Sequence, residues 1–194
     1  DIVLINGIDE IGIGVTVTSP ANPAPLPMLK VDEPTLTMNF CVNTSPLAGR
    51  EGKYVTSRQI WDRLQKELQS NVALRVSETD EEGIFEVMGR GELHLSVLIE
   101  TMRREGFELA VSRPEVIIKE IDGQLMEPVE QLVVDIEEVH QGGVMDKLGT
   151  RKAQLKNMES DGRGRVRLDY MIPARGLIGF QNEFRTLTQG SGLL

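Results

Sequence analysis

Residues 84–93 read IFEVMGRGEL, and residues 166–177 read VRLDYMIPARGL. Each stretch is a predicted return strand of a β-hairpin, followed by a short break that contains glycine and then by the start of a predicted helix. A hairpin that leads directly into a helix therefore occurs twice in the chain. This repetition predicts two copies of one supersecondary unit.

The segments around the first stretch complete one such unit. Thr56 and Gln59 have the spacing of a helix capping box, and Gly106 is a typical helix end. The predicted elements, in order, are a strand over 36–42, a helix from the capping box to 68, strands over 72–76 and 84–88, a helix from 95 to 102, and a strand over 107–111. The order is β-α-β-β-α-β.

The second unit repeats this order. Its predicted elements are a strand over 132–136, a short helix over 144–148, strands over 153–158 and 166–172, a helix over 177–187, and a last strand that begins at Leu193. We therefore predict an α+β chain with two ferredoxin-like domains in tandem, over 35–123 and 124–194, the second with a truncated last strand.

The N-terminal residues differ from both units. Isoleucine and valine alternate with glycine and threonine over 11–17, which predicts a half-buried strand. Four prolines within 20–27 favour an extended linker, so we expect a domain boundary near residue 30.

Charge is distributed unevenly along the chain. The 194 residues carry 21 Lys and Arg against 30 Asp and Glu, a formal net charge of −9, which disfavours non-specific binding to DNA or RNA. Residues 124–146 hold six acids and no base, whereas 147–185 hold nine bases and four acids. A surface that faces a polyanion is therefore expected in the second unit.

Two groups of basic residues lie in that region. Arg165 and Arg167 share a predicted sheet face with Asp135 and Glu137, so cross-strand ion pairs account for them without a partner. The other group has fewer acidic neighbours and is the candidate for contact with RNA phosphates: Lys147, Arg151, Lys152, Lys156, Arg175 and Arg185.

No constellation typical of an enzyme is present. Gly52-Lys53 is followed by Tyr54, where a phosphate-binding loop needs Ser or Thr. His94 and His140 lack a second ligand at metal-binding spacing, and Cys41 lacks an activating base. We therefore predict no catalytic, cofactor-binding or metal-binding residue, and we expect the Gly52-Lys53 segment to be a mobile surface loop.

The compartment follows from simple features. A lone cysteine fits a reducing cytoplasm. The apolar runs are far shorter than the roughly 20 residues needed to cross a bilayer, and no secretory signal is present. We expect a cytoplasmic, monomeric chain that has no membrane partner.

Several motifs resemble the BipA/TypA family of bacterial translational GTPases and, more loosely, elongation factor G. The segments that carry this resemblance are VDEPT at 31–35, NTSP at 43–46, GREGKYVTSR at 49–58, GRGELHL at 89–95, MRREGFE at 102–108 and RVRLDY at 165–170. The resemblance extends over nearly the whole chain and is weakest in 1–28.

The resemblance implies a function and a domain order. Residues 1–30 would be the end of a β-barrel domain, and the GTPase domain, with its GTP and Mg²⁺, would lie outside this sequence. The family binds the ribosome in its GTP form and is linked to large-subunit assembly and to growth under stress. The fragment would then hold no cofactor and would dock on ribosomal RNA of the large subunit.

Two other functions stay open. Paired ferredoxin-like domains can form a small-molecule sensor, which would have a ligand pocket between the domains. An autonomous enzyme would need the reactive groups that are missing here.

Overall fold

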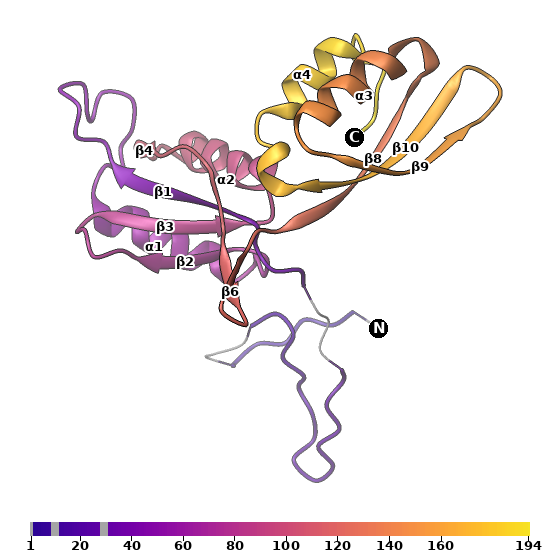
Figure 1. Ribbon diagram of the computed structural model, residues 1–194. Coiled ribbons are helices and arrows are strands. Elements are labelled where there is room, and N and C mark those ends of the chain that lie inside the picture. Colours follow the sequence, from indigo (N-terminus) through magenta and orange to yellow (C-terminus); the bar gives the residue numbers. More distant parts are fainter. Residues whose placement is uncertain (1, 9–11, 28–30) are drawn as a thin grey trace.

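The computed structural model describes residues 2–8, 12–27 and 31–194, and it contains two α/β units (Figure 1). The first consists of β1 (Leu36–Val42), α1 (Ser57–Leu68), β2 (Arg75–Glu78), β3 (Ile84–Gly89), α2 (Glu92–Glu105) and β4 (Leu109–Val111), with the short β5 (Glu115–Val116) also paired to β1. The antiparallel sheet has the order β2-β3-β1-β4, which is the ferredoxin-like order. The predicted fold of this unit is confirmed.

Strand alternation explains how this unit buries its core. β1 and β3 pair with Phe40 opposite Phe85, and both side chains lie under the helices. Ile60 and Leu64 of α1, together with Leu95, Leu98 and Met102 of α2, cover them. Thr37, Asn39 and Cys41 face the opposite side of β1, as the period of two predicted.

The ends of both helices follow the sequence signals. The Thr56 side chain accepts a hydrogen bond from the Gln59 backbone N–H, and the Gln59 side chain accepts one from the Thr56 N–H. Gly106 ends α2 with φ 96°, a left-handed conformation that glycine adopts without strain. These contacts are local, so they stabilise the helix ends independently of tertiary packing.

The second unit has the same architecture. It consists of β8 (Val129–Glu137), η1 (Glu138–His140), α3 (Gln141–Thr150), β9 (Gln154–Ser160), β10 (Arg165–Pro173), η2 (Ala174–Gly176) and α4 (Phe180–Leu187). The sheet order is β8-β10-β9, and α3 and α4 lie over one face (Figure 1). Leu193 forms two 2.9 Å backbone hydrogen bonds with Asp135 on the free edge of β8, in the position expected of the fourth strand.

Three details of the second half differ from the predictions. The helix predicted over 177–187 begins only at Phe180, because residues 177–179 form a turn after η2. α3 begins at Gln141 and includes Gly142 and Gly143, because the 3₁₀ turn η1 already sets the chain in a helical conformation. A hairpin formed by β6 (Lys119–Ile121) and β7 (Gln124–Met126) was not predicted. Asp122 and Gly123 both have positive φ in its two-residue turn, so the Asp-Gly pair was a signal for it. The predicted boundary between residues 123 and 124 falls in this turn.

The strand predicted over 11–17 is not formed by the residues that the structure describes there. Residue 11 lies outside the described residues, while Ile13, Val15 and Val17 are exposed and belong to no strand. Among residues 2–8, 12–27 and 31–194 no strand pairs with this segment, so its backbone groups have no ladder to join. Alternation alone predicted a strand, but a strand also needs a neighbour.

The capping box gives a stability prediction. Thr56→Ala removes the side-chain acceptor for the Gln59 N–H and lowers the free energy of unfolding by about 1 kcal/mol. Ser57→Ala, one residue further into the helix, is the control and changes this free energy by less than about 0.5 kcal/mol. Urea denaturation measures both, and equal effects of the two substitutions contradict the role of the cap.

Candidate nucleic-acid interface

The six predicted phosphate contacts lie in four places in the structure. Lys147 lies on α3, Arg185 lies on α4, and Lys152 follows the C-terminal end of α3; all three side chains are exposed. None of them takes part in an ion pair found among residues 2–8, 12–27 and 31–194. We call Lys147, Lys152 and Arg185 the helix-side cations.

Arg151 makes most of its polar contacts with other groups of the second unit. Its Nη1 donates hydrogen bonds to the carbonyl oxygens of Gly176, at 2.7 Å, and Ile178, at 3.0 Å. Its Nη2 lies 3.2 Å from Glu183, and its guanidinium stacks over the Phe180 ring at 5.2 Å from the centroid. Only 21% of its side chain is exposed, so these contacts, and not a free charge, define its role.

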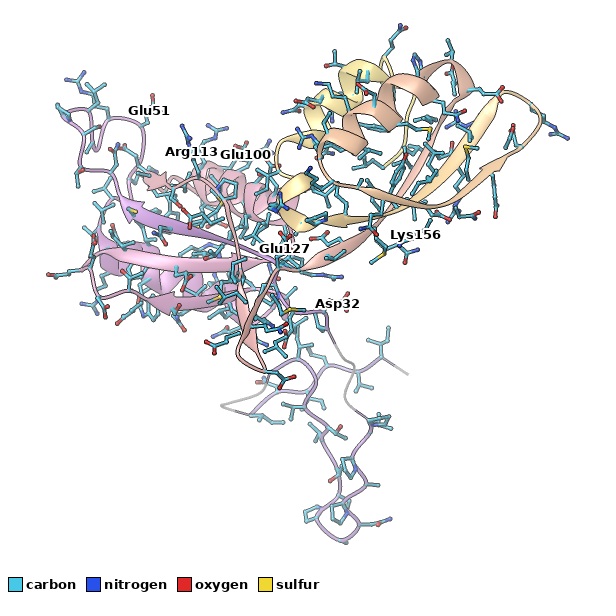
Figure 2. The ribbon with its side chains drawn as sticks, in the orientation of Figure 1. Asp32, Glu51, Glu100, Arg113, Glu127 and Lys156 are labelled. Atoms are coloured by element: carbon cyan, nitrogen blue, oxygen red, sulfur yellow. The ribbon has the colours of Figure 1, made fainter. Side chains whose placement is uncertain are left out.

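Arg175 and Lys156 are separated from the helix-side cations. The Nε of Arg175 donates to Glu127 at 2.7 Å, where the two units meet (Figure 2), and this hydrogen bond raises the pKa of Arg175. Lys156 lies on the sheet face opposite α3 and α4 (Figure 2), with its Nζ 3.2 Å from the Gln154 side-chain oxygen. The six residues therefore do not form one continuous surface.

The second arginine group pairs with acids on the open sheet face. Arg165 Nε donates to Asp135 Oδ1 of the neighbouring strand at 2.7 Å, as predicted. Arg167 is directly opposite Asp135 in the strand register, but its Nε lies 3.3 Å from Asp169 on its own strand and forms its ion pair there. Arg163, which the sequence interpretation left out, is exposed in the β9–β10 turn and lies next to these pairs along the chain.

A carboxylate nest in the first unit was also missed. The Glu108 side chain accepts hydrogen bonds from the backbone N–H groups of Gly49, Glu51 and Gly52, at 3.0 to 3.2 Å, and from the Asn43 amide at 2.7 Å. These bonds, that of Gly49 first, hold the pKa of Glu108 below its usual value. The loop over 43–53 is thus organised around a carboxylate, where the sequence suggested a mobile loop.

Gly52 is required by this nest. A Cβ atom at this position would lie 2.6 Å from the Glu108 Cβ and 2.8 Å from its backbone nitrogen. The only sequence signal was that two of the family-like segments contain these residues, since no local pattern joins positions 56 residues apart.

The surroundings of His94 and Cys41 fit structural roles. His94 Nδ1 accepts from the Arg90 N–H at 3.2 Å, so its Nε2 donates to the Asn71 side-chain oxygen at 3.1 Å. Burial, and then the charge of Arg90, lower the pKa of His94. Burial also raises the pKa of Cys41, which disfavours its reactive thiolate.

Two absences hold for the part of the chain that the structure describes. No three side chains of His, Cys, Asp or Glu converge there as a metal site would require. None of its helices is long and apolar enough to cross a bilayer.

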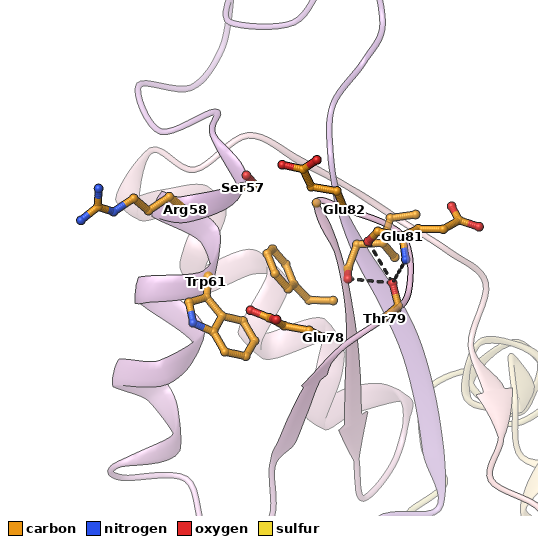
Figure 3. A pocket seen from close by; sticks show the side chains of 10 residues that line it. Ser57, Arg58, Trp61, Glu78, Thr79, Glu81 and Glu82 are labelled. Atoms are coloured by element: carbon orange, nitrogen blue, oxygen red, sulfur yellow. Dashed lines mark hydrogen bonds between the residues drawn. The ribbon is translucent and has the colours of Figure 1, made fainter.

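The first unit contains a hollow of about 300 Å³ between the start of α1 and the β2–β3 hairpin (Figure 3). Trp61 forms one wall and stacks against Phe85 at 5.2 Å, and Glu78 and Glu82 lie across from it. A second hollow, of about 220 Å³, lies between residues 33–35 and the β6–β7 hairpin. The first hollow is lined by residues of the first unit alone, whereas the second is lined from both sides of the predicted 123/124 boundary, by residues 33–35 and Lys119 on one side and Met126 to Pro128 on the other.

Comparison with known proteins gives matches along the whole chain. A family model described as elongation factor G C-terminus matches residues 124–194. Proteins named large ribosomal subunit assembly factor BipA are 65% identical in Salmonella typhimurium (strain LT2), 66% in Escherichia coli (strain K12) and 62% in Haemophilus influenzae. Each match covers 100% of this chain and 32% of the relative, so the chain spans about a third of the length of these relatives.

The fold also occurs in a solved structure. A crystal structure of a protein from Thermus thermophilus matches with a TM-score of 0.51 and 14% sequence identity, over 89% of this chain and 41% of that one. At this identity the match shows the fold alone.

The structural role of Arg151 can be measured. Arg151→Ala removes two charge-assisted hydrogen bonds and lowers the free energy of unfolding by about 1.5–3 kcal/mol. Lys152→Ala removes a neighbouring exposed charge and changes it by less than about 0.5 kcal/mol. Equal urea midpoints for the two variants contradict this assignment.

The nest gives a prediction for pH and for substitution. Because the folded loop favours ionised Glu108, its contribution is present above the usual carboxylate pKa of about 4.3 and is lost as pH falls through the lowered folded value. Hydrogen exchange protection at the amides of Gly49, Glu51 and Gly52 decreases over this range. Glu108→Gln reduces the same protection at pH 7.

The neighbouring substitution Glu51→Gln is the control, since its side chain accepts none of these bonds. Protection that is unchanged in Glu108→Gln, or reduced equally in Glu51→Gln, contradicts the role of Glu108.

Proposed function

Because this chain belongs to the BipA family, we propose that it is the part of a translational GTPase that docks on the large ribosomal subunit during its assembly. The relatives carry the large-subunit assembly role in their names. The match of residues 124–194 to the elongation factor G C-terminus supports docking through the second unit.

The observation that carries this proposal is the set of helix-side cations. Lys147, Lys152 and Arg185 are exposed and have no acidic partner within the described part of the chain. A phosphate backbone attracts such side chains and releases counterions when they bind. The net charge of −9 opposes indiscriminate RNA binding, so the contact depends on this local excess of base.

The other parts of the assignment follow from the same proposal. GTP and Mg²⁺ would bind in a domain outside these residues, and the present chain would carry no catalytic group. The protein would act in the cytoplasm on ribosomal RNA and ribosomal proteins, as a monomer without a membrane or DNA partner. The division into 1–30, 35–123 and 124–194 is part of this proposal.

The predicted phosphate contacts are revised accordingly. Arg151 and Arg175 are each paired with a carboxylate, and Lys156 is on the other sheet face, so we propose a lesser contribution from these three. Arg163 is exposed on the β9–β10 turn and is an additional candidate. The side chains that remain free to meet a phosphate define the surface.

The small-molecule sensor is the second candidate. Its pocket was predicted between the domains, whereas the hollow that supports it lies beside Trp61 within the first unit. An aromatic wall with carboxylates opposite favours an organic cation. A sensor would show ligand-dependent thermal stabilisation that Trp61→Leu abolishes, whereas ribosome docking would not depend on this side chain.

Charge reversal tests the docking surface. The triple variant Lys147→Glu, Lys152→Glu, Arg185→Glu in the full-length protein loses co-sedimentation with purified large subunits. If each side chain meets one phosphate, the slope of log affinity against log salt falls by about 2–3, since each contact contributes roughly 0.7–0.9. Binding is measured at several salt concentrations.

A matched control reverses three exposed bases of the first unit, Arg50, Arg58 and Arg113, which changes the net charge equally. The proposal is wrong if the helix-side variant binds as tightly as the native protein, or loses no more affinity than this control.

A further inference from the structure

The two units have separate hydrophobic cores, and residues 174–180 of the second unit, which end at Phe180 of its own core, contact the first unit. This segment includes η2, which packs against β5 of the first unit, and it leads into α4. Figure 1 shows it beside α2. A change in the orientation of one unit would therefore act on the other through this segment.

Among the described residues of this segment, Ile178 is the side chain that packs against the core of the first unit, beside the contact of η2 with β5. Leu177 packs against the core of its own unit, whereas the next residue, Ile178, is half-buried against the core of the first unit. Consecutive residues thus point into different cores. We call Ile178 the plug, because it is a side chain of the second unit that packs against the core of the first.

Within the described part of the chain, the polar contact from this segment to the first unit is one charge-assisted hydrogen bond. The carboxylate of Glu92, the first residue of α2, accepts from the Gly179 N–H at 2.9 Å. Gly179 has φ 70°, a left-handed conformation that another residue would adopt only with strain. A charged acceptor makes this bond stronger than one between neutral groups.

Arg151 sets the shape of the segment from within the second unit. Its guanidinium binds the carbonyls of Gly176 and Ile178, on both sides of Leu177. A Cβ on Gly176 would lie 2.8 Å from the Arg151 carbonyl oxygen, so the backbones are in close contact. The plug is therefore presented in a fixed conformation.

The contact is small compared with the cores that it joins. Among the described residues, the segment is held to the first unit by half-buried Ile178, by the bond from Gly179 to Glu92 and by the packing of η2 on β5. Each unit has its own core apart from these contacts. Interfaces of this kind between domains open without unfolding. The Ala174 N–H and Arg175 bind Pro128 and Glu127, at the junction about which the units would turn.

We propose that residues 174–180 form a latch between the two units, closed by Ile178 and by the bond from Gly179 to Glu92. When the latch is closed, the orientation of the second unit relative to the first is fixed. When it is open, the second unit turns about the junction at Glu127 and Pro128. The proposal does not rest on the proposed function, because it concerns the chain alone.

Spin-label distances test the latch in the 194-residue chain. Labels are attached to cysteines introduced at Lys66 and Arg163, one exposed position in each unit, with Cys41→Ser to remove the native thiol. The native sequence gives one narrow distance distribution. Ile178→Ser increases the fraction of molecules outside it by about tenfold, the shift expected from removing a half-buried isoleucine.

Three variants make the result specific. Glu92→Ala, at an exposed position where misfolding is not a concern, also broadens the distribution, and Glu92→Gln, which keeps a carbonyl acceptor, broadens it less. Val139→Ser removes an exposed apolar side chain of the second unit and leaves the distances unchanged. An unchanged distribution in both Ile178→Ser and Glu92→Ala overturns the proposal, as does a native chain already as broad as these variants.

Discussion

The pairing of the two central strands in each sheet is the constraint on which the rest of the structure depends. β1 pairs with β3, and β10 pairs with β8, each in a register that places every second side chain under the helices. A shift by one residue would turn Phe40 or Leu168 to the solvent side. The helices, their connections and the exposed positions of the cations all follow from this register.

Several arginines of this molecule bind groups within the chain, whereas Arg185 stays exposed like Lys147 and Lys152. Arg63 binds Glu67 and Glu105, Arg151 clamps two carbonyls, and Arg165 binds Asp135, so these guanidinium groups act as internal connections. The planar guanidinium presents several donors at once and suits such contacts, whereas the ammonium of lysine is compact and strongly hydrated. Counting positive charges along a sequence therefore overestimates the charge available to a partner.

Among the described carboxylates that bind backbone N–H groups, Glu108 and Glu92 hold segments that are distant in sequence. Glu108 gathers the N–H groups of one loop, and Glu92 takes the N–H of Gly179 from the other unit. In both cases a negative oxygen satisfies an amide that lies outside helices and strands, which unpaired would cost free energy if buried. The acidic character of the chain thus contributes directly to its tertiary structure.

The sequence by itself determined the element types, their order and the buried faces, because these depend on spacing between near neighbours. The Thr56 cap, the Gly106 helix end, the alternation in β1 and the ion pair of Arg165 all have local or adjacent-strand causes. The strand predicted over 11–17 failed because pairing needs a second strand, which spacing within one segment does not supply.

Only the tertiary structure decided which bases are free, how the loop over 43–53 is held and how the two units meet. Arg151 lies 25 residues from Gly176, and Glu108 lies 56 residues from Gly52, so each contact depends on where folding places a distant backbone. Local patterns carry information about distances of a few residues. Where a long polar side chain points, and whether it is already hydrogen-bonded within the chain, depend instead on donors and acceptors contributed by the whole fold.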